Sequence, residues 1–418
     1  SLGGWGMSFE WTNTTLAEFA EINPKRPIAK GTLASFVDMA ALPAHSRDVS
    51  LTDVVQRPFT NGGAKFANGD TLVARITPCL ENGKTAMVSG LPAGRNAHGS
   101  TEFIVLGPRS DDDRNFLYYL ARSEDFRTYA ISRMEGTSGR QRVPNSAVGQ
   151  YAFSCPRKSV RKEIGNFLCA LDDRITLLRE TNATLEAIAQ ALFKSWFVDF
   201  DPVRAKMEGR APESMDEATA ALFPDGLEES ALGLVPRGWR VGTLQDLLLL
   251  QRGFDLPSDD RVPGDFPIIA ASGPSGTHNI SIAKAPGVVT GRSGILGRVF
   301  LELDDYWPLN TTLWVREFRA ATPCYAYELL RLLDLKSFNA GSAVPTLNRN
   351  HIHSLPYLVP PHNCVIAYEL IAMQLHERAR LNDEQSQTLA TLRDTLLPRL
   401  ISGQLRLPDL AAAEACNP

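Results

Sequence analysis

The sequence has few cysteines and no long apolar run. Six cysteines occur among 418 residues, and none forms a C-x-x-C pair, so neither a disulfide framework nor a common zinc site is predicted. The richest apolar stretch, residues 247–250, is far shorter than the ~20 residues that cross a bilayer. We therefore expect no contact with a membrane and a location in a reducing cytoplasm.

Motifs that support catalysis are also missing. A Gly-Lys-Thr triplet at 83–85 resembles the end of a phosphate-binding loop, but Pro78 occupies the required upstream glycine position. Neither a glycine-rich nucleotide fingerprint nor an Asn/Asp-Pro-Pro-aromatic motif for base methylation occurs. We interpret His351 and His353, with Cys364 nearby, as ordinary surface or groove residues and not as metal ligands. These absences favour a protein that is not an enzyme.

The chain has little net charge, but the charge is unevenly distributed. The net value is −4, and residues 208–236 contain seven acids and one base. That segment therefore carries −6 and leaves +2 for the rest of the chain. A small net charge argues at first against a nucleic-acid partner, but it does not exclude local basic surfaces.

An internal repeat with an offset of 204 residues is the strongest signal of organisation. Residues 143–156 match residues 347–360, and the same register continues into the segment that follows. There the aligned pairs are Leu171 with Leu375, Leu185 with Leu389, and Leu192 with Leu396. A second similarity, between residues 11–16 and 239–244, marks the start of each repeat. The predicted order is head, helix, linker, head, helix.

The first predicted helix has the apolar spacing of a coiled coil. An unbroken 4-3 spacing runs through Ile164, Leu168, Leu171, Ile175, Leu178, Asn182, Leu185, Ala189, Leu192 and Trp196. Asn182 is the kind of polar residue that fixes register. The repeated segment at about 364–402 supplies a partner helix, although Ala379, Asn382, Ser386 and Arg393 weaken its apolar seam. The alternative is one long amphipathic helix packed on its own head.

Connectivity favours an antiparallel pair of helices. In that arrangement the linker at 201–236 covers a short distance, whereas a parallel pair would require it to return ~50 Å. The predicted fold is α+β, with two mixed α/β domains separated by two long antiparallel helices and related by a pseudo-twofold axis. The expected boundaries are 8–157 for head 1, 158–200 for helix 1, 201–236 for the acidic linker, 237–361 for head 2, 362–403 for helix 2 and 404–418 for the tail.

Both heads show the punctuation of mixed α/β domains. Residues 70–76, 102–106 and 288–289 are predicted strands, bounded by Gly, Pro and Asn. Residues 116–120 and 325–333 are predicted helices.

The loops of both heads are rich in residue types that contact DNA. Arginine and lysine bind phosphates or guanine, and glutamine and asparagine read adenine. The candidates in head 1 are Lys65, Arg75, Thr77, Lys84, Arg95, His98, Ser100, Arg133, Ser138, Arg140, Gln141 and Arg142. The candidates in head 2 are Arg252, Thr290, Arg292, Ser293, Arg298, Asn310 and Ser342. Solvated turns are the alternative interpretation for each position.

Several motifs resemble the DNA-specificity subunit of type I restriction–modification systems, over nearly the whole chain. They are LFKSWFVDFDPVRAK at 192–206, LGLVPRGW at 232–239, LPRLISG at 397–403, GDTLVAR at 69–75 and GSTEFI at 99–104. The head–helix duplication agrees with them. The resemblance implies a cytoplasmic prokaryotic protein that carries out no chemistry itself.

In that family, each head is a target recognition domain that reads one half of a split, asymmetric site in double-stranded DNA. The paired helices set the length of the unread spacer and dock two methylation subunits. S-adenosylmethionine is then expected on the methylation subunits, and ATP and Mg²⁺ on partner subunits that include the restriction subunits. For this chain, the helix-pair and partner contacts are assigned to Leu171, Ile175, Leu178, Asn182, Leu185, Leu192, Trp196, Leu375, Leu389 and Leu396.

Two other functions remain as alternatives. The chain itself could methylate or cut DNA, which would require binding of S-adenosylmethionine or Mg²⁺ to the isolated chain. It could also be a coiled-coil scaffold that never touches nucleic acid, and charge reversal at Arg140 and Arg142 would then leave function intact. Because partner subunits are expected to supply much of the phosphate binding, the chain alone is predicted to bind DNA weakly or non-specifically.

Overall fold

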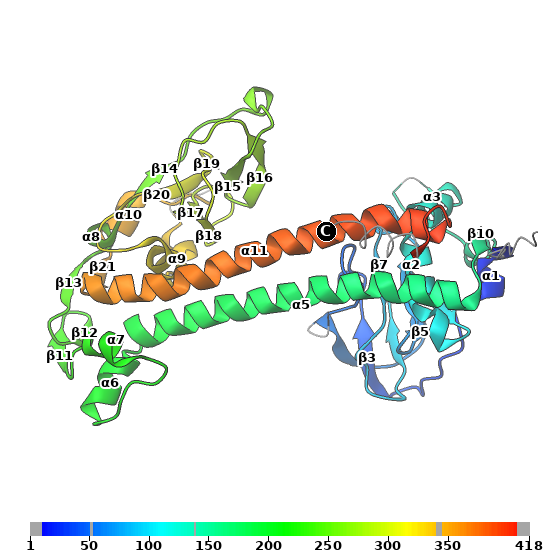
Figure 1. The fold of residues 1–418 in the computed structure, drawn as a ribbon, viewed down its shortest axis with the longest axis horizontal. Coiled ribbons are helices and arrows are strands. Elements are labelled where there is room, and N and C mark those ends of the chain that lie inside the picture. The colour runs from blue at the N-terminus through cyan, green and yellow to red at the C-terminus, as the bar shows by residue number, and fades with distance from the viewer. Residues whose placement is uncertain (1–10, 51–52, 138, 340–344, 408–418) are drawn as a thin grey trace, which may run out of the picture. The chain divides into compact units, whose positions relative to one another are not determined.

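The computed structural model describes residues 11–50, 53–137, 139–339 and 345–407. Contacts divide the chain into two compact units. Unit 1 comprises Ser1–Arg179 with Asp383–Pro418, and unit 2 comprises Glu180–Asn382. Two helices of 40 residues each, α5 (Lys158–Phe197) and α11 (His362–Ile401), contribute residues to both units. They are the green and orange-red helices in Figure 1.

The repeat in the sequence is also a repeat of structure. The offset of 204 carries three elements onto their copies without a change in length: α4 (Asn145–Gly149) onto α10 (Arg349–His353), β10 (Ala152–Cys155) onto β21 (Pro356–Val359), and α5 onto α11. An offset of 228 does the same for β1 (Thr12–Thr15) and β13 (Arg240–Thr243), and for α1 (Leu16–Phe19) and α8 (Leu244–Leu247). The predicted duplication is therefore confirmed.

Each head begins and ends in the same way. Strand β1 pairs antiparallel with β10 in unit 1, and β13 pairs antiparallel with β21 in unit 2. A capping box follows each first strand, built by Thr15 with Glu18 in one unit and by Thr243 with Asp246 in the other. The backbone N–H of each threonine donates to the carboxylate, and this bond lowers the pKa of Glu18 and of Asp246.

Head 1 contains two four-stranded sheets. One has the order β2-β9-β6-β7, formed by Ala20–Ile22, Phe103–Pro108, Thr71–Ala74 and Thr85–Met87. The other has the order β4-β3-β8-β5, formed by Val55–Pro58, Leu33–Val37, Ala97–Gly99 and Ala64–Phe66. Phe66, Leu72 and Phe103 form part of one buried cluster. Helices α2 (Arg114–Arg122) and α3 (Glu124–Ser132) follow β9.

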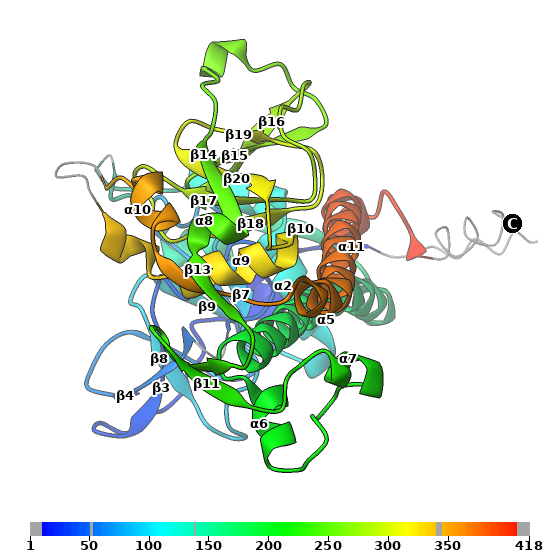
Figure 2. The ribbon, with the colours of Figure 1, turned by 90° about the vertical axis from the view of Figure 1, so that its left-hand side faces the viewer.

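Head 2 also contains two sheets, and its second sheet has three strands where that of head 1 has four; Figure 2 labels the strands of head 2. Its four-stranded sheet has the order β14-β20-β17-β18, formed by Leu248–Arg252, Thr312–Phe318, Gly287–Gly291 and Val299–Glu302. Its second sheet has the order β16-β15-β19, formed by Gly273–His278, Phe266–Ala270 and Trp307–Pro308. Helix α9 (Pro323–Leu332) corresponds to α2. The strands and helices predicted for the two heads are confirmed, with small differences at their ends.

Both heads pack on the long helices through the start of one of their own helices. In unit 1, a Cβ at Gly165 of α5 would lie 2.7 Å from the backbone nitrogen of Phe116, so glycine allows α2 to approach closely. In unit 2, the repeat places Glu369 at that position. Its carboxylate accepts a hydrogen bond of 2.9 Å from the N–H of Cys324 at the start of α9.

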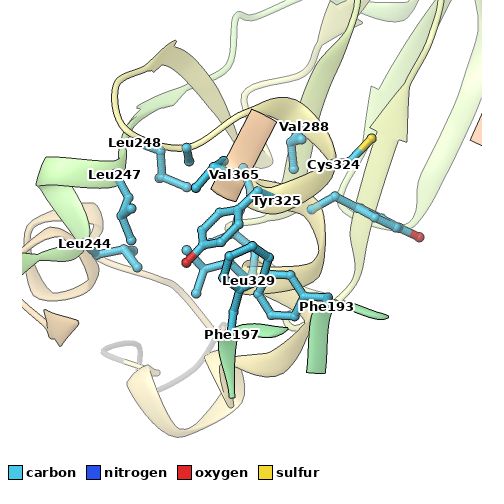
Figure 3. Close-up of a cluster of buried hydrophobic side chains, with 14 of the residues drawn as sticks. Phe193, Phe197, Leu244, Leu247, Leu248, Val288, Cys324, Tyr325, Leu329 and Val365 are labelled. Carbon is cyan, nitrogen blue, oxygen red and sulfur yellow. The ribbon is translucent and has the colours of Figure 1, made fainter. Parts of the chain in front are cut away.

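A large buried cluster joins head 2 to the parts of α5 and α11 in unit 2 (Figure 3). Tyr325 and Leu329 from α9 contact Phe193 and Phe197 from α5. The ring centroids of Phe197 and Tyr325 lie 4.9 Å apart in an edge-to-face arrangement, which adds to the effect of burial. Val365 of α11 belongs to the same cluster.

The predicted acidic linker is folded. It contains α6 (Asp201–Met207), α7 (Glu217–Ala221) and a hairpin of β11 (Leu227–Ser230) and β12 (Gly233–Pro236). Its Phe223 is buried and packs edge-to-face on Trp196 at 5.2 Å. The apolar residues between the acids therefore join the core of unit 2.

The long helices pair antiparallel within each unit. In unit 1, Asp172 of α5 forms an ion pair with Arg393 of α11, and Leu168 shares a buried cluster with Leu400. In unit 2, the Nδ2 of Asn382 donates to the Oδ1 of Asn182 at 2.8 Å, and Tyr368 donates to the carbonyl of Ala189 at 3.1 Å. Residues later in α5 therefore contact residues earlier in α11, which is the predicted antiparallel arrangement.

The residues assigned to the helix pair lie in this seam to different depths. Ile175, Leu178, Trp196 and Leu396 are buried, whereas Leu171, Asn182, Leu185, Leu192, Leu375 and Leu389 are half-buried. No helix in the described ranges is long and apolar enough to span a bilayer.

Candidate nucleic-acid interface

Arg75 and Arg292 occupy the same position in the two heads. Each follows a central strand, β6 in head 1 and β17 in head 2. The N–H of Arg75 donates to the carbonyl of Glu102, and the N–H of Arg292 donates to that of Thr311. The carbonyls of both arginines accept from residues 143 and 347, which the offset of 204 relates. The repeated backbone therefore presents one half-exposed arginine in each head.

The loop with the highest density of candidates is fixed to this arginine in head 1. Glu135 and Arg142 exchange two backbone hydrogen bonds of 2.9 Å, which close the loop. The N–H of Thr77 donates to the carbonyl of Gln141, and the N–H of Gln141 donates to the hydroxyl of Thr77. Arg140, between these fixed ends, is exposed. The loop thus has an anchored base and an exposed cationic tip.

Arg142 is partly neutralised. It donates to both carboxylate oxygens of Glu102, with a closest distance of 2.7 Å. This paired hydrogen bonding lowers the pKa of Glu102. Glu102 therefore stays ionised and orients Arg142.

Two candidate side chains are buried and cannot reach DNA in this structure. His98 in β8 is 7% exposed and packs between the rings of Phe36 and Phe59. Thr290 in β17 is fully buried, and its hydroxyl donates to the carbonyl of Arg298. Both residues lie in short strands that the sequence analysis treated as polar loops, and their assignment to the DNA surface is wrong.

The remaining candidates of head 1 differ in how free their side chains are. Arg95 and Arg133 are exposed, and Lys65 is half-buried. The ammonium of Lys84 donates to the carbonyl of Met39 at 2.7 Å, and the hydroxyl of Ser100 accepts from the N–H of Glu102. The first contact joins Lys84 to the turn that follows β3, and the second lies within a local turn. Ser138 lies outside the described residues.

In head 2, two candidates converge on one carboxylate. Arg252 lies 3.3 Å from Asp255, and the amide of Asn310 donates to the same side chain. Arg298 is exposed, and Ser293 forms an isolated β-bridge with Thr346. Ser342 lies outside the described residues.

Lys25 and Arg26 are two further cations of head 1 that were not among the predicted DNA contacts. Together with Lys65 and Arg75 they line a cavity of about 660 Å³ in head 1. The sequence does contain a pattern that could have identified them, the Pro-Lys-Arg-Pro run at 24–27. Prolines on both sides restrict the backbone around the two cations. Only the fold brings these cations to Lys65 and Arg75.

The histidine and cysteine group considered as a metal site has a packing role. His353 is buried, and its Nε2 accepts a hydrogen bond of 2.8 Å from the N–H of Leu250. Cys364 is also buried. Across the described ranges, no three His, Cys, Asp or Glu side chains are grouped as metal ligands would be.

Comparison with known proteins finds relatives of one kind. No model of a protein family matches the chain. The specificity subunit of the type I restriction enzyme HindI from Haemophilus influenzae is 27% identical, over 82% of this chain and 88% of that protein. The specificity subunit of type I enzyme MjaIX from Methanocaldococcus jannaschii is 23% identical, over 72% of both chains.

A solved structure shows the same fold. The S subunit of a type I restriction–modification system from M. genitalium matches with a TM-score of 0.61 and 15% identity, over 96% of this chain and 98% of that one. The sequence relatives make this chain a homologue of type I restriction enzyme specificity subunits, as predicted, and the solved S subunit shares its fold.

Proposed function

We propose that the chain is the DNA-reading subunit of a type I restriction–modification complex, with each head reading one half of a bipartite, asymmetric site. The observation that carries this proposal is one backbone frame with different side chains. Arg75 and Arg292 hold the same position, whereas the repeat replaces Gln141 by Pro345 and Arg142 by Thr346. Equivalent frames favour equivalent contacts with the DNA backbone, and different side chains favour different base sequences.

The helix pair is the candidate for setting the spacer and for docking two methylation subunits. Leu177 and Leu381 are related by the offset of 204 and are 51% and 48% exposed. Ile188 and Leu392 are related in the same way and are 47% and 43% exposed. On each helix the two residues are 11 positions apart, which places them on one face.

These apolar positions occur once per repeat, so they fit two copies of one partner. Leu177 and Leu392 belong to unit 1, and Leu381 and Ile188 belong to unit 2. Single exposed apolar residues are common on proteins, but a repeated pair on a helix surface favours a repeated contact. In this proposal the methylation subunits carry S-adenosylmethionine, and the restriction subunits use ATP and Mg²⁺.

Replacing head 1 by a second copy of head 2 tests the function. The segments 12–155 and 240–359 have matching first and last strands, so one can be substituted for the other in the full chain. Produced with its partner subunits, the variant should methylate a symmetric site that carries the head 2 half-site at both ends. Long-read sequencing of methylated adenines measures this. Methylation of the unchanged asymmetric site would contradict the proposal, and the wild-type complex is the control.

A further inference from the structure

The cavity of head 1 has an excess of positive charge. Its polar lining comes from separate segments: Lys25 and Arg26 after β2, Lys65 in β5, Arg75 after β6, and Thr101 and Asn145 from loop and helix ends. None of the described residues that line it is acidic. A cavity of about 660 Å³ falls in the range of small-ligand sites.

One of these cations is already neutralised, and it stiffens the cavity wall. Arg26 donates to both oxygens of Asp70, at 2.7 and 2.9 Å, and Asp70 is fully buried. Asn23 holds the preceding turn with a positive φ of 51° and accepts a hydrogen bond from the N–H of Val105. Backbone strain of this kind is retained where the surrounding structure enforces it.

The other three cations form no direct ion pair with a described residue, although Arg75 is close enough to Glu102 to help lower the pKa of that carboxylate. Within the described ranges, no carboxylate lies within ion-pair distance of Lys25, Lys65 or Arg75. The Nε of Arg75 is buried and has no hydrogen-bond partner there. A buried guanidinium nitrogen without a partner is costly, and an anion in the cavity would satisfy it.

We propose that this cavity binds a phosphate group of the DNA backbone. The idea rests on the proposed function. A phosphate suits three converging cations with a hydroxyl and an amide nearby, and the apolar side chains of Phe103 and Val105 line the same cavity. Arg75 also anchors the loop that carries Arg140, so a phosphate held here lies beside a candidate base-reading loop.

The Lys25–Arg26 pair is not repeated at the equivalent positions of head 2. The offset of 228 that relates the first strands of the heads places Gly253 and Phe254 where head 1 has Lys25 and Arg26. Head 2 therefore has an equivalent of Arg75, which is Arg292, but no equivalent of Lys25 and Arg26.

The test compares two exposed lysines of one loop. Lys25 lines the cavity, whereas Lys30 does not. DNA binding by the complex with methylation subunits is measured by fluorescence anisotropy over a range of salt concentrations, with duplexes that contain or lack the methylated site. The Lys25→Gln/Lys65→Gln variant should bind each duplex roughly tenfold more weakly than the wild type, with a similar loss for both duplexes. The magnitude of the slope of log K against log salt should fall by about one. Lys30→Gln should change neither quantity.

A second measurement separates the sources of phosphate. Inorganic phosphate should raise the thermal midpoint of the full-length wild-type chain and of Lys30→Gln, but not that of the double variant. Phosphate stabilisation without an effect on DNA binding would overturn the backbone assignment, and absence of both effects would overturn the site. Loss of site preference alone would indicate a base contact and also overturn it. If the wild-type complex prefers no DNA sequence, the proposed function fails, while the phosphate titration still tests the cavity.

Discussion

At the scale of single residues, Glu328 on α9 is a carboxylic acid buried beside one guanidinium. Its side chain is 1% exposed and lies 3.2 Å from Arg331. Burial raises the pKa of Glu328 to about 7, against the opposing effect of Arg331. Arg331 also donates to Tyr327, and Arg122 donates to Tyr118 in unit 1 in the same way. The tyrosine–arginine pair is thus repeated, whereas Glu328 occurs in unit 2 only.

This raised pKa predicts a pH dependence of stability. Between about pH 4.5 and 7 the folded state binds the proton of Glu328 more tightly than the unfolded state, so stability falls as pH rises through this window. Glu328→Gln should remove this pH dependence. The change in the free energy of unfolding that the substitution causes should be more favourable at pH 8 than at pH 5 by about 1–3 kcal/mol.

Urea unfolding of both proteins across this pH range provides the measurement. The difference between wild type and variant cancels other titrating groups, including Glu302, whose pKa burial also raises to about 7. A difference that stays constant from pH 5 to pH 8 would show that Glu328 titrates normally.

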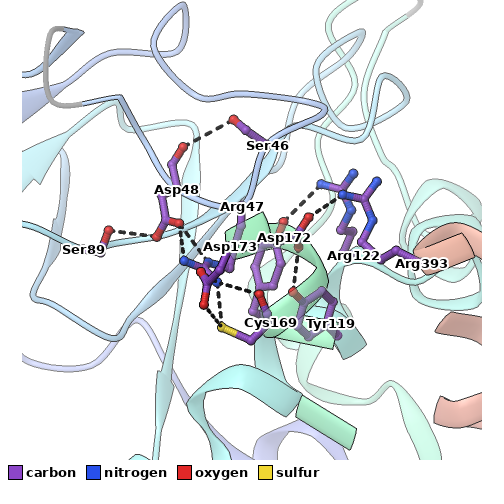
Figure 4. A network of polar contacts seen from close by, with 11 residues as sticks. Ser46, Arg47, Asp48, Ser89, Tyr119, Arg122, Cys169, Asp172, Asp173 and Arg393 are labelled. Atoms are coloured by element: carbon purple, nitrogen blue, oxygen red, sulfur yellow. Dashed lines mark hydrogen bonds and ion pairs between the residues drawn. The ribbon is translucent and has the colours of Figure 1, made fainter. Parts of the chain in front are cut away.

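At the scale of elements, the polar residues of α11 meet polar residues of α5. Arg393 and Asp172 are each 4% exposed in their side chains and form an ion pair. Tyr119 donates to the other oxygen of Asp172 at 2.6 Å, as Figure 4 shows. In unit 2, the buried Asn382 donates to Asn182. The apparent weakness of the second apolar seam is therefore a matched polar pairing, which favours one register of the helices.

Removing only one partner of this ion pair should destabilise the protein more than removing both. Arg393→Leu leaves the buried carboxylate of Asp172 with Tyr119 alone and should destabilise the protein by about 3–5 kcal/mol. Asp172→Leu/Arg393→Leu should recover most of this loss, because no buried charge remains. Denaturant unfolding measures both. The exposed Arg399→Leu on the same helix is the matched control and should change stability by less than about 0.5 kcal/mol.

The head of unit 1 makes a second polar contact with α5. Arg47 lies 2.7 Å from Asp48 in its own loop and 2.7 Å from Asp173 on the helix, and it also contacts Cys169 (Figure 4). Asp172 and Asp173 are adjacent in sequence but contact different elements. Asp172 contacts α11 and α2, and Asp173 contacts a loop of the head.

At the scale of the whole molecule, the duplication predicts two equivalent docking positions. Leu177→Asp should weaken binding of one methylation subunit and Leu381→Asp that of the other, so each variant should yield complexes with one bound copy. The double variant should bind neither. Native mass spectrometry of the copurified complexes counts the copies. Leu370 on α11 is 64% exposed, and its repeat equivalent is Asn166, so Leu370→Asp is the control. Two bound copies in both single variants would exclude these leucines from the contact.

Most of the architecture was predictable because its signals are local or periodic. The offset of 204 and the 4-3 apolar spacing identified two matched helices, and the connecting segment of 36 residues favoured their antiparallel pairing. The linker was interpreted from its charge, and so its buried Phe223 was missed. The candidate surface was predicted less well, because residue type alone does not separate an exposed arginine such as Arg140 from a buried histidine such as His98.

The duplication, the two long helices and the positions of most strands follow from the amino-acid sequence, since periodicity and turn residues act over a few neighbouring positions. Three relations emerge only when the chain is folded: Arg393 contacts Asp172, Thr290 is buried, and Lys25, Lys65 and Arg75 line one cavity. Those relations join residues tens to hundreds of positions apart. They depend on how sheets and helices pack and exclude water, which no local pattern of residues encodes.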